Sequence, residues 1–369
     1  MIVYIKEFPG KLTQATVRVW LKDFIPVSLY NGECTSYQDY VIISKYDNHK
    51  NITGDATILI YEDFFESFSQ NILEEINYNY DYYYLYNALE EAKNNTAIDT
   101  IVTGSSYGLF GIDQSLPLSV NLSLMSQDLY YSVMGIKNVC EYNHNIKNIV
   151  LCCSYYYLYN DLSMTQNPTE ISRISKVYYP LFHDLHNTLH LPPKINFLPE
   201  SKLIDIHKVI QLFSREEYVN HYFNNERPKT RFATKVWDDI SKTWQQLSEE
   251  ERTQAGIIRA DLHNSGIKYV NSFKENERIL ENLSQYCDEK KINLVILSTP
   301  ISSYYREASL PQYKEDFYRV LNNIQGTIHL IDLYDDLSFT IDDYNDTDHL
   351  NDLGAAKLTS MLQEVLNKL

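Results

Sequence analysis

The sequence predicts an α/β protein built on a mostly parallel sheet sandwiched by helices. Short apolar runs rich in Val and Ile, such as IDTIV and INLVILS, have the length of buried strands. Longer amphipathic segments stand between these runs, as at 271–290 and 312–323. Strands that alternate with helices imply parallel pairing, because each crossover helix covers a face of the sheet.

Length and charge bound the class of protein. The chain has 369 residues, enough for one large domain with insertions, or for one and a half domains. It carries 32 Lys and Arg against 49 Asp and Glu, which gives a formal charge of −17. Such a surface repels phosphate backbones and anionic headgroups, so we expect neither nucleic acid nor a membrane surface as a partner.

Three observations predict a cytoplasmic protein without membrane insertion. No segment approaches the roughly 18 apolar residues that cross a bilayer. The stretch MIVYIKEFPGKLTQ lacks the apolar core of a secretory signal. Five Cys without a CxxC pair, two of them adjacent at Cys152 and Cys153, are typical of buried thiols in a reducing compartment. The oligomeric state is left open.

The first half of the chain divides into two predicted parts. Residues 1–61 form a β-rich segment, because ATVRVWLKDF, DYVIISKY and DATILIY alternate apolar and polar side chains. Residues 62–163 form the first part of the α/β domain. A helical pattern to about residue 95 is followed there by a strand at 98–103, the strand LSVNLSL, a helix over about 127–143 and the strand KNIVLCCS.

The second half is also predicted in two parts. Residues 164–270 are helix-rich and charged, with loop signals such as LPPKINFLP, and are predicted to form a helical insertion or cap. Residues 271–369 return to the parallel rhythm as the second part of the α/β domain. This part contains a helix to about Lys290, the strand INLVILSTP, a helix over 312–323, the strand TIHLIDLY and a helix from Gly354.

Two candidate chemical groups follow early strands, at the carboxyl ends where open parallel sheets bind ligands. Ser106 lies in GSSYG, beside a predicted helix start whose free N–H groups can stabilise an oxyanion. Ser126 ends the next strand, and its N–H is a candidate second oxyanion donor. A helix N-cap is the alternative interpretation of the serine in GSSYG, and a plain turn that of Ser126.

The motif DTDH precedes the last predicted helix. Histidine acts as a general base when an acid orients it, and a spacing of three lets a tight turn bring Asp346 against Nδ1 of His349. The adjacent Asp348 is worse placed because neighbouring side chains diverge. Asp342 and Asp343 remain alternative acids, and a solvated acidic loop remains an alternative for the whole motif. A serine after an early strand with such a pair is typical of a catalytic triad.

The motifs VTGSSYGLFGID, VNLSLMSQ and DTDHLNDLGAAKLT resemble those of the SGNH/GDSL hydrolase superfamily, in its GSS-type branch with D-alanyl transfer proteins and sugar O-acyltransferases. The resemblance implies a flavodoxin-like three-layer fold with Ser106 as nucleophile, His349 as base and Asp346 as acid. It covers 97–163 and 271–369, and explains neither the N-terminal strands nor the helical insertion.

The chain departs from the family pattern in the blocks that form the oxyanion hole. Ser126 stands where the second block has a Gly, and Ser105 stands where the first block commonly has Asp. The third block, G-x-N-D in the family, is matched only by LYND at 158–161, in which the Gly is lost. The resemblance therefore implies an oxyanion hole made of the Ser106 and Ser126 N–H groups with the Asn160 side chain.

A second family shares part of the pattern. GSSYG also satisfies G-x-S-x-G, the nucleophile elbow of α/β-hydrolases, which would keep Ser106 and His349 but take its acid from Asp332 or Asp336. An acid and a base three residues apart on one loop favour the SGNH interpretation.

Other chemistries leave weaker signals. The sequence holds neither a glycine-rich phosphate loop with Lys nor an HExxH motif, so no cofactor is expected. His183, His186 and His190 lie near helical spacing, which makes a metal site conceivable. No suitable third ligand is evident, so a helix face that is solvated or lies at the edge of the core is the preferred interpretation, and no metal is expected.

The expected function is serine-dependent acyl transfer. The first expectation is an esterase or deacetylase that removes ester groups, O-acetyl above all, from a carbohydrate or small ester through an acyl-enzyme. The alternative is a polysaccharide or sugar O-acetyltransferase with the same triad, which needs acetyl-CoA or another acyl donor as co-substrate. A third hypothesis, favoured by the substitutions in the second and third blocks, is a catalytically degraded module that binds a glycan or a protein.

Overall fold

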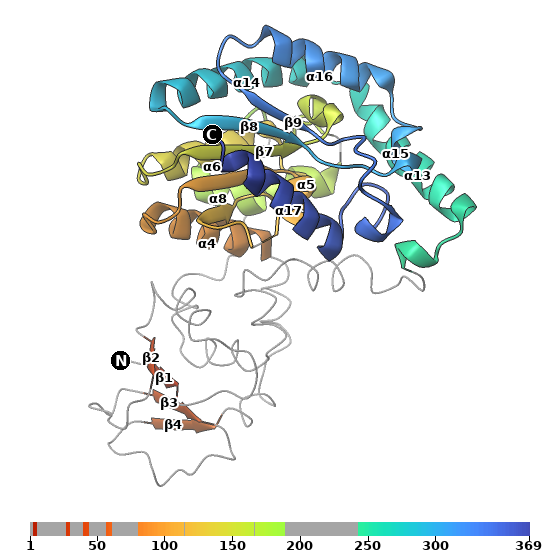
Figure 1. Cartoon of the computed structure of the whole chain (residues 1–369). Coiled ribbons are helices and arrows are strands. Elements are labelled where there is room, and N and C mark those ends of the chain that lie inside the picture. The colour runs from red at the N-terminus through yellow and green to blue at the C-terminus, as the bar shows by residue number, and fades with distance from the viewer. Residues whose placement is uncertain are drawn as a thin grey trace. The chain divides into compact units, whose positions relative to one another are not determined.

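The computed structural model describes residues 80–188 except Gln114 and Gln166, residues 243–369, and four short strands nearer the N-terminus (Figure 1). The chain divides into two compact units, one of Met1–Asn87 with Lys194–Glu226 and one of Ala88–Pro193 with Arg227–Leu369.

The first unit contains a parallel sheet of four strands in the order β2-β1-β3-β4. β3 and β4 fall in the predicted strand runs DYVIISKY and DATILIY, whereas the run ATVRVWLKDF lies outside the described residues. The strands are β1 (Val3–Ile5), β2 (Val27–Leu29), β3 (Tyr40–Ile43) and β4 (Thr57–Ile60).

The second unit is built on a five-stranded sheet, all parallel, in the order β6-β5-β7-β8-β9. This confirms the predicted α/β class with a mostly parallel sheet. The central strands are buried on both faces, which explains why they read as continuous apolar runs. The strands are β5 (Thr100–Gly104), β6 (Ser119–Asn121), β7 (Asn148–Cys153), β8 (Asn293–Ser298) and β9 (His329–Asp332).

Helices cover both faces of this sheet and give it three layers. α14 packs against α6 on one face, and α17 packs against α5 on the other (Figure 1). The α-helices are α4 (Tyr80–Asn94), α5 (Ser106–Gly111), α6 (Leu129–Cys140), α7 (Pro168–Arg173), α8 (Tyr179–Phe182), α13 (Glu249–Asn264), α14 (Val270–Lys290), α15 (Ser303–Arg306), α16 (Pro311–Asn323) and α17 (Asp352–Leu366). Short turns of 3-10 helix are η2 (Tyr155–Tyr159), η4 (Trp244–Gln246), η5 (Ser265–Lys268) and η6 (Ile341–Asp343), and η3 (Ile174–Tyr178) is a π-helix.

The helices predicted at 271–290 and 312–323 begin within one residue of those observed, whereas the last helix, predicted over 354–369, is observed at Asp352–Leu366. α16 begins at Pro311, which suits a first helical position because its missing N–H would have no helical partner. α17 begins at Asp352, before the predicted Gly354, because the Asn351 side chain accepts the N–H groups of Leu353 and Gly354. Capping chemistry, and not apolar periodicity, therefore decides where α17 starts.

One part of the core lies between α17 and the sheet. Leu358 and Leu362 of α17 are fully buried against Val102, Val150 and Val295 from three neighbouring strands. The four described cysteines are free and buried, as expected for structural thiols. This packing holds the loop before α17 at the carboxyl ends of the strands.

The helices described within the predicted insertion at 164–270 include α13. A capping box between Ser248 and Glu251 starts α13. Gly256 lets it approach α15 closely, because a Cβ at this position would overlap the carbonyl oxygen of Tyr304. Glycine weakens a helix interior, so the close approach is the physical reason for Gly256.

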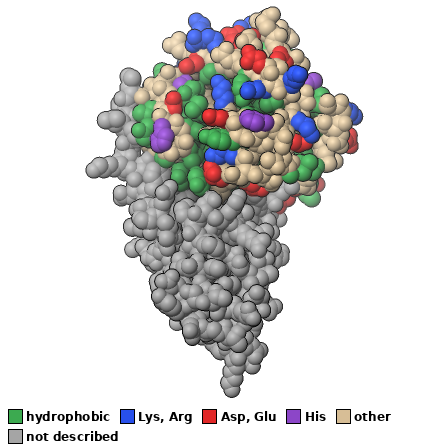
Figure 2. Space-filling view, turned by 90° about the vertical axis from the view of Figure 1, so that its left-hand side faces the viewer, with side chains coloured by type: hydrophobic (Ala, Val, Ile, Leu, Met, Phe, Trp, Pro, Cys, Tyr) green, Lys and Arg blue, Asp and Glu red, His purple; other side chains and the backbone are tan. Residues whose placement is uncertain are grey.

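The described surface is mixed in character. Lys and Arg side chains lie scattered among acidic, polar and apolar ones on the described part of the face in Figure 2. Among the described helices, none combines the length and the apolar character needed to cross a bilayer.

Gly104 is required at the end of β5. Its φ of +130° is a conformation that residues with side chains rarely adopt, and a Cβ there would overlap the carbonyl oxygen of Cys152 in β7. We expect Gly104→Ala to lower the free energy of unfolding by about 2–5 kcal/mol, because backbone strain adds to overpacking. Denaturant unfolding followed by circular dichroism measures this.

Gly135→Ala in α6 is the matched control. A Cβ at Gly135 would lie 3.5 Å from the nearest atom of Leu122, which is an ordinary contact. This substitution should raise the free energy of unfolding by about 0.5–1 kcal/mol through the helix propensity of Ala. Equal effects of the two substitutions would contradict the role given to Gly104.

Candidate active site

Ser106, His349 and Asp346 are joined by hydrogen bonds at the carboxyl edge of the five-stranded sheet. Ser106 Oγ lies 2.9 Å from His349 Nε2, although the two residues are 243 positions apart. His349 Nδ1 lies 3.1 and 3.0 Å from the two carboxylate oxygens of Asp346. Because a carboxylate only accepts, this arrangement places the proton on Nδ1 and leaves Nε2 to accept the serine hydroxyl. The structure thus brings together the three predicted triad residues.

The turn after β5 positions Ser106. Gly104 ends the strand, Ser105 is extended at the N-cap position, and Ser106 is the first residue of α5. The Ser105 side chain makes no capping bond, and its hydroxyl, although buried, has no hydrogen-bond partner within the described part of the chain. The Ser106 hydroxyl bonds to the imidazole, so neither serine side chain acts as the N-cap that was the alternative interpretation of this motif.

A tight turn positions Asp346 behind His349, as the spacing predicted. One Asp346 oxygen accepts the backbone N–H groups of Asp348 and His349 at 2.9 and 2.8 Å, while both of its oxygens face Nδ1. The turn is tied to the loop after β8, because the Ser302 hydroxyl donates to the Thr347 carbonyl at 2.5 Å. Hydrogen bonds from backbone N–H groups therefore fix the position of the Asp346 carboxylate, in addition to its rotamer preference.

Aromatic rings from α5 enclose the imidazole. The Tyr107 ring stacks on His349 with 5.5 Å between centroids, and Phe110 meets it edge-on at 5.4 Å. Only 7% of Ser106 and 7% of His349 is exposed. Packing of this kind fixes the ring plane and strengthens the hydrogen bonds of the site by excluding water.

Two carboxylates act on the pKa of His349. Burial alone would lower this pKa, but the negative charges of Asp346 and Asp348 outweigh burial, so the pKa is raised above its ordinary value. Asp348 lies farther away, at 3.7 Å from Nδ1. The sequence therefore identified the nearer acid, and the second carboxylate adds to its field.

Asp348 anchors a second network beside the triad. Although burial opposes ionisation, Arg259 and then His349 hold the pKa of Asp348 well below its usual range. The Arg259 Nε lies 3.0 and 3.1 Å from its two oxygens, and the Tyr107 hydroxyl donates to it at 2.9 Å. Sequence reasoning treated Asp348 only as a rejected acid. It missed Arg259, because α13 carries no motif that points to the site.

Tyr156 extends this network toward a buried histidine. Its hydroxyl lies 3.2 Å from that of Tyr107, and its ring stacks on His263 with 4.0 Å between centroids. Burial, with the charge of Arg259, lowers the pKa of His263 to about 3, so this imidazole is neutral. His263 Nδ1 lies 2.6 Å from the Tyr305 hydroxyl. These aromatic residues extend the network that begins at Asp348, and no sequence motif marked them.

Ser126 occupies a tight turn after β6. The Gln127 N–H donates to the Leu124 carbonyl, and Ser126 has a φ of +56°, which favours glycine at this turn position. The Leu124 N–H donates to the Gly104 carbonyl, which ties the turn to the end of β5. The N–H groups of Ser106 and Ser126 donate no hydrogen bond within the described part of the chain, and their use as oxyanion donors stays a prediction.

Asn160 is tied to a different element. It follows η2, its N–H donates to the Tyr157 carbonyl, and its own carbonyl accepts the Asn276 side chain at 2.9 Å. Among the described residues, no hydrogen bond joins Asn160 to Ser106 or His349. Its place in the oxyanion hole stays a prediction.

The other acids considered from the sequence form hydrogen bonds elsewhere. Asp332 accepts the hydroxyl groups of Tyr155 and Tyr318, so it faces the aromatic residues of η2 and α16. Asp336 and Asp343 accept backbone N–H groups of their own loops, and the Asp342 carbonyl accepts the Asn351 side chain. The acid on Nδ1 of His349 is therefore Asp346 and neither acid of the nucleophile-elbow alternative.

The expectation of a helix face is wrong for His183 and His186, because α8 ends at Phe182. His183 follows in a left-handed conformation, His186 lies farther along the chain, and His190 lies outside the described residues. His186 stacks on Tyr130 at 3.7 Å, which places it in the core edge and not on a helix.

His186 also meets two carboxylates that the sequence did not bring together. Its Nδ1 lies 3.5 Å from Asp161, and ligand atoms of His186, Asp161 and Asp128 lie within 4.8 Å of one another. Asp128 caps α6 through Tyr131 and also accepts the Leu162 N–H, while Asp161 accepts hydroxyl groups of Ser163 and Ser272. The carboxylate oxygens thus already accept hydrogen bonds, and the cluster connects α6, α14 and the loop after η2.

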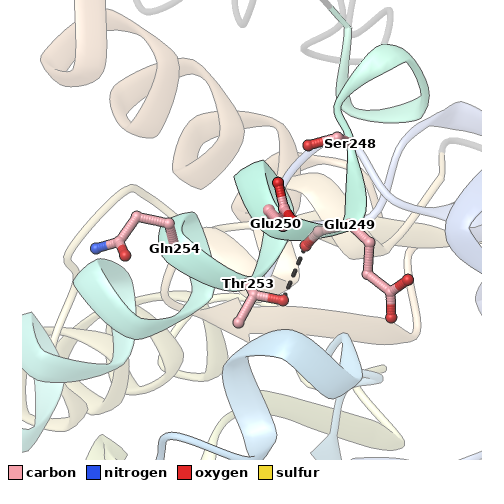
Figure 3. Close-up of a pocket in the computed structure, with 5 residues that line it drawn as sticks. All are labelled: Ser248, Glu249, Glu250, Thr253 and Gln254. Carbon is pink, nitrogen blue, oxygen red and sulfur yellow. Dashed lines mark hydrogen bonds between the residues drawn. The ribbon is translucent and has the colours of Figure 1, made fainter.

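A hollow of about 690 Å³ opens over the first turn of α13 (Figure 3). Its described lining contains none of the triad residues. The Thr253 hydroxyl there donates to the Glu249 carbonyl, which is a bond within the helix. Hydrogen-bond geometry, and not this hollow, locates the candidate active site. The lining residues are Ser248, Glu249, Glu250, Thr253 and Gln254.

Comparisons with known proteins identify no family for this chain. No protein-family model matches the chain, and a search of curated proteins finds no match. The similarity to SGNH/GDSL hydrolases therefore stays a prediction from the quoted motifs, whereas the contacts among Ser106, His349 and Asp346 are observed in the structure.

The turn at Ser126 gives a stability prediction. Ser126→Gly should raise the free energy of unfolding by about 0.5–1 kcal/mol, because relief of the left-handed strain exceeds the added chain entropy of glycine. Ser126→Val should lower it, because a β-branched residue tolerates a positive φ least. Thermal unfolding of the two variants and the parent protein measures both effects, and the opposite order would contradict the turn assignment.

Proposed function

We propose that this protein is a serine-dependent acyl-transfer enzyme that hydrolyses ester groups, O-acetyl above all, on a carbohydrate. The observation that carries the proposal is the hydrogen bond of 2.9 Å between Ser106 Oγ and His349 Nε2, with Asp346 on the opposite ring nitrogen. A hydroxyl becomes a nucleophile when a base in this position takes its proton.

The reaction follows from the order of these contacts. Ser106 Oγ attacks the ester carbonyl carbon while its proton moves to His349 Nε2. The imidazolium, stabilised by Asp346, then gives this proton to the departing alcohol, which leaves an acyl-serine. Water next attacks the acyl carbon and loses a proton to the same nitrogen. The imidazolium then returns this proton to Ser106 Oγ as the bond to the acyl carbon breaks, which releases the carboxylic acid and the free serine.

The tetrahedral intermediate needs donors for its oxyanion. The N–H groups of Ser106 and Ser126 are the proposed donors, because neither donates elsewhere in the described part of the chain. Asn160 remains a proposed third donor on the basis of the family resemblance. The carbohydrate substrate also rests on that resemblance, and a cytoplasmic location is proposed from the sequence.

Replacing Ser106 should abolish the proposed activity. We expect Ser106→Ala to lower the rate of 4-nitrophenyl acetate hydrolysis by at least about 10³-fold and to prevent labelling by a serine-directed fluorophosphonate. Release of nitrophenol and intact-mass analysis are the two measurements.

Ser105→Ala is the matched control, because this neighbour contributes a hydroxyl with no partner among the described residues. It should retain labelling and most of the activity. Acylated sugar that forms only when a sugar acceptor is present would instead support the O-acetyltransferase. Absence of both turnover and labelling in the parent protein would contradict the proposal and favour a binding module.

The acid limb of the pH profile reports His349. The base must be neutral to accept a proton, so kcat/KM rises with pH through the pKa of His349. Since Asp346 and Asp348 raise this pKa against the effect of burial, the midpoint should lie above the usual value of about 6.5. Asp346→Asn should move the midpoint to lower pH and reduce the maximal rate by about 10³–10⁴-fold.

Asp336→Asn controls for a general change in charge, because the hydrogen bonds that Asp336 accepts from described residues lie within its own loop. Its profile should match that of the parent protein. An acid limb that keeps its midpoint in Asp346→Asn would show that His349 is not the titrating base.

A further inference from the structure

Within the described residues, Arg259 is bound through one of its three nitrogens. Its Nε contacts both oxygens of Asp348, at 3.0 and 3.1 Å. Neither Nη1 nor Nη2 donates a hydrogen bond within the described part of the chain. The side chain is 32% exposed, so solvent or a ligand can reach it.

Both oxygens of Asp348 already accept two hydrogen bonds each, so Asp348 offers no further acceptor position to the terminal nitrogens of Arg259. One of its oxygens also accepts the Thr347 hydroxyl at 2.8 Å, and the other accepts the Tyr107 hydroxyl at 2.9 Å. The carboxylate is 1% exposed. Arg259 is thereby held in place at Nε, which leaves two parallel N–H groups of the guanidinium in a fixed orientation.

A comparison within the same helix shows that this arrangement is specific. Arg252 lies two turns earlier in α13, where its Nε donates to the Tyr304 hydroxyl and its Nη1 to the carbonyls of Trp244 and Leu247. Arg252 therefore uses its terminal nitrogen to hold the protein together, as structural arginines do. Arg259 does not.

Arg259 is also connected through Asp348 to the imidazole of the site. Asp348 directly precedes His349, and Tyr107, which shares the same carboxylate, directly follows Ser106. The positive charge of Arg259 is close enough to act on the pKa of His349, which it lowers. Asp348, which Arg259 contacts, lies 3.7 Å from His349 Nδ1, so a single carboxylate separates the guanidinium from the imidazole, in a chain whose net charge is −17.

We propose that Nη1 and Nη2 of Arg259 bind an anionic group, a carboxylate or a phosphate, on the ester substrate. This inference rests on the proposed acyl-transfer function. A planar fork of two N–H donors fits a carboxylate or a phosphate better than it fits a neutral sugar hydroxyl. A substrate of this class is an ester on an acidic or phosphorylated sugar. Because a single guanidinium carries the site, the ligand is a small anionic substituent and not a polyanion.

Three acetyl esters that differ only in the para substituent test the proposal. They are 4-acetoxybenzamide, 4-acetoxybenzoate and 4-acetoxyphenyl phosphate, which carry a neutral group, a carboxylate and a phosphate. The parent protein should hydrolyse one anionic ester with a kcat/KM about 10- to 100-fold above the neutral one, after division by the spontaneous rates. Which anion is preferred identifies the source of the charge.

Arg259→Gln should remove this preference, mainly through KM, and Arg259→Lys should retain part of it while keeping the charge beside Asp348. Arg252→Gln is the matched control on the same helix and should keep the full preference. Equal loss for all three esters in Arg259→Gln would overturn the proposal, because a residue that only positions the His349 loop cannot distinguish them. An absent preference in the parent protein would also overturn it.

Binding without turnover separates this inference from the proposed function. Calorimetry with Ser106→Ala and the three intact esters should give tighter binding of an anionic ester, and the double variant Ser106→Ala, Arg259→Gln should lose that difference. If the parent protein hydrolyses none of the esters but this difference is present, the enzyme proposal fails and the anion site stands. Equal binding of all three esters would overturn the anion site.

Discussion

The contact between Ser106 Oγ and His349 Nε2 depends on backbone geometry at two distant points of the chain. On one side, Gly104 adopts a φ of +130° against Cys152, which lets the chain leave β5 and begin α5 at once. On the other side, the turn at Asp346 is closed by backbone N–H groups and tied to Ser302. Both turns lie at the carboxyl edge of a parallel sheet, where every strand end is brought to the same side. The parallel direction of the strands thus brings the two turns together, and the side chains then form the contacts of the site.

Charge is paired closely within this buried site. Ionised groups are costly to bury without a partner, and each buried carboxylate here has one, because Asp346 faces His349 Nδ1 and Asp348 faces Arg259. The pairing explains why two carboxylates can lie on the same turn of chain. It also separates two tasks, because one carboxylate orients the imidazole while the other holds a guanidinium beside it. Tyr107 connects them by stacking on His349 and donating to Asp348.

α13 shows how a segment outside the α/β pattern completes the site. It belongs to the predicted insertion, yet it packs directly on α15 through Gly256, and Arg259 follows one helical turn later. Because Gly256 allows close packing of α13 on α15, the residue one turn later, Arg259, lies within reach of Asp348. Neither the apolar periodicity of α13 nor its charges mark Gly256 or Arg259 as special, since a glycine at a helix–helix contact is recognisable only when both helices are known.

From the sequence alone one could predict the parallel α/β class, the strands and helices of the second half, and the meeting of Ser106, His349 and Asp346, because local periodicity and a spacing of three residues are read directly from the chain. The tertiary structure decided the rest. Asp348, Arg259 and Tyr156 come together through packing between elements that no local pattern connects. His186 does not lie on the expected helix, because α8 ends at Phe182. Long-range contacts with Asp161 and Tyr130 position its side chain instead. Local patterns specify elements, whereas charge pairing and close approach depend on distances that only the folded chain defines.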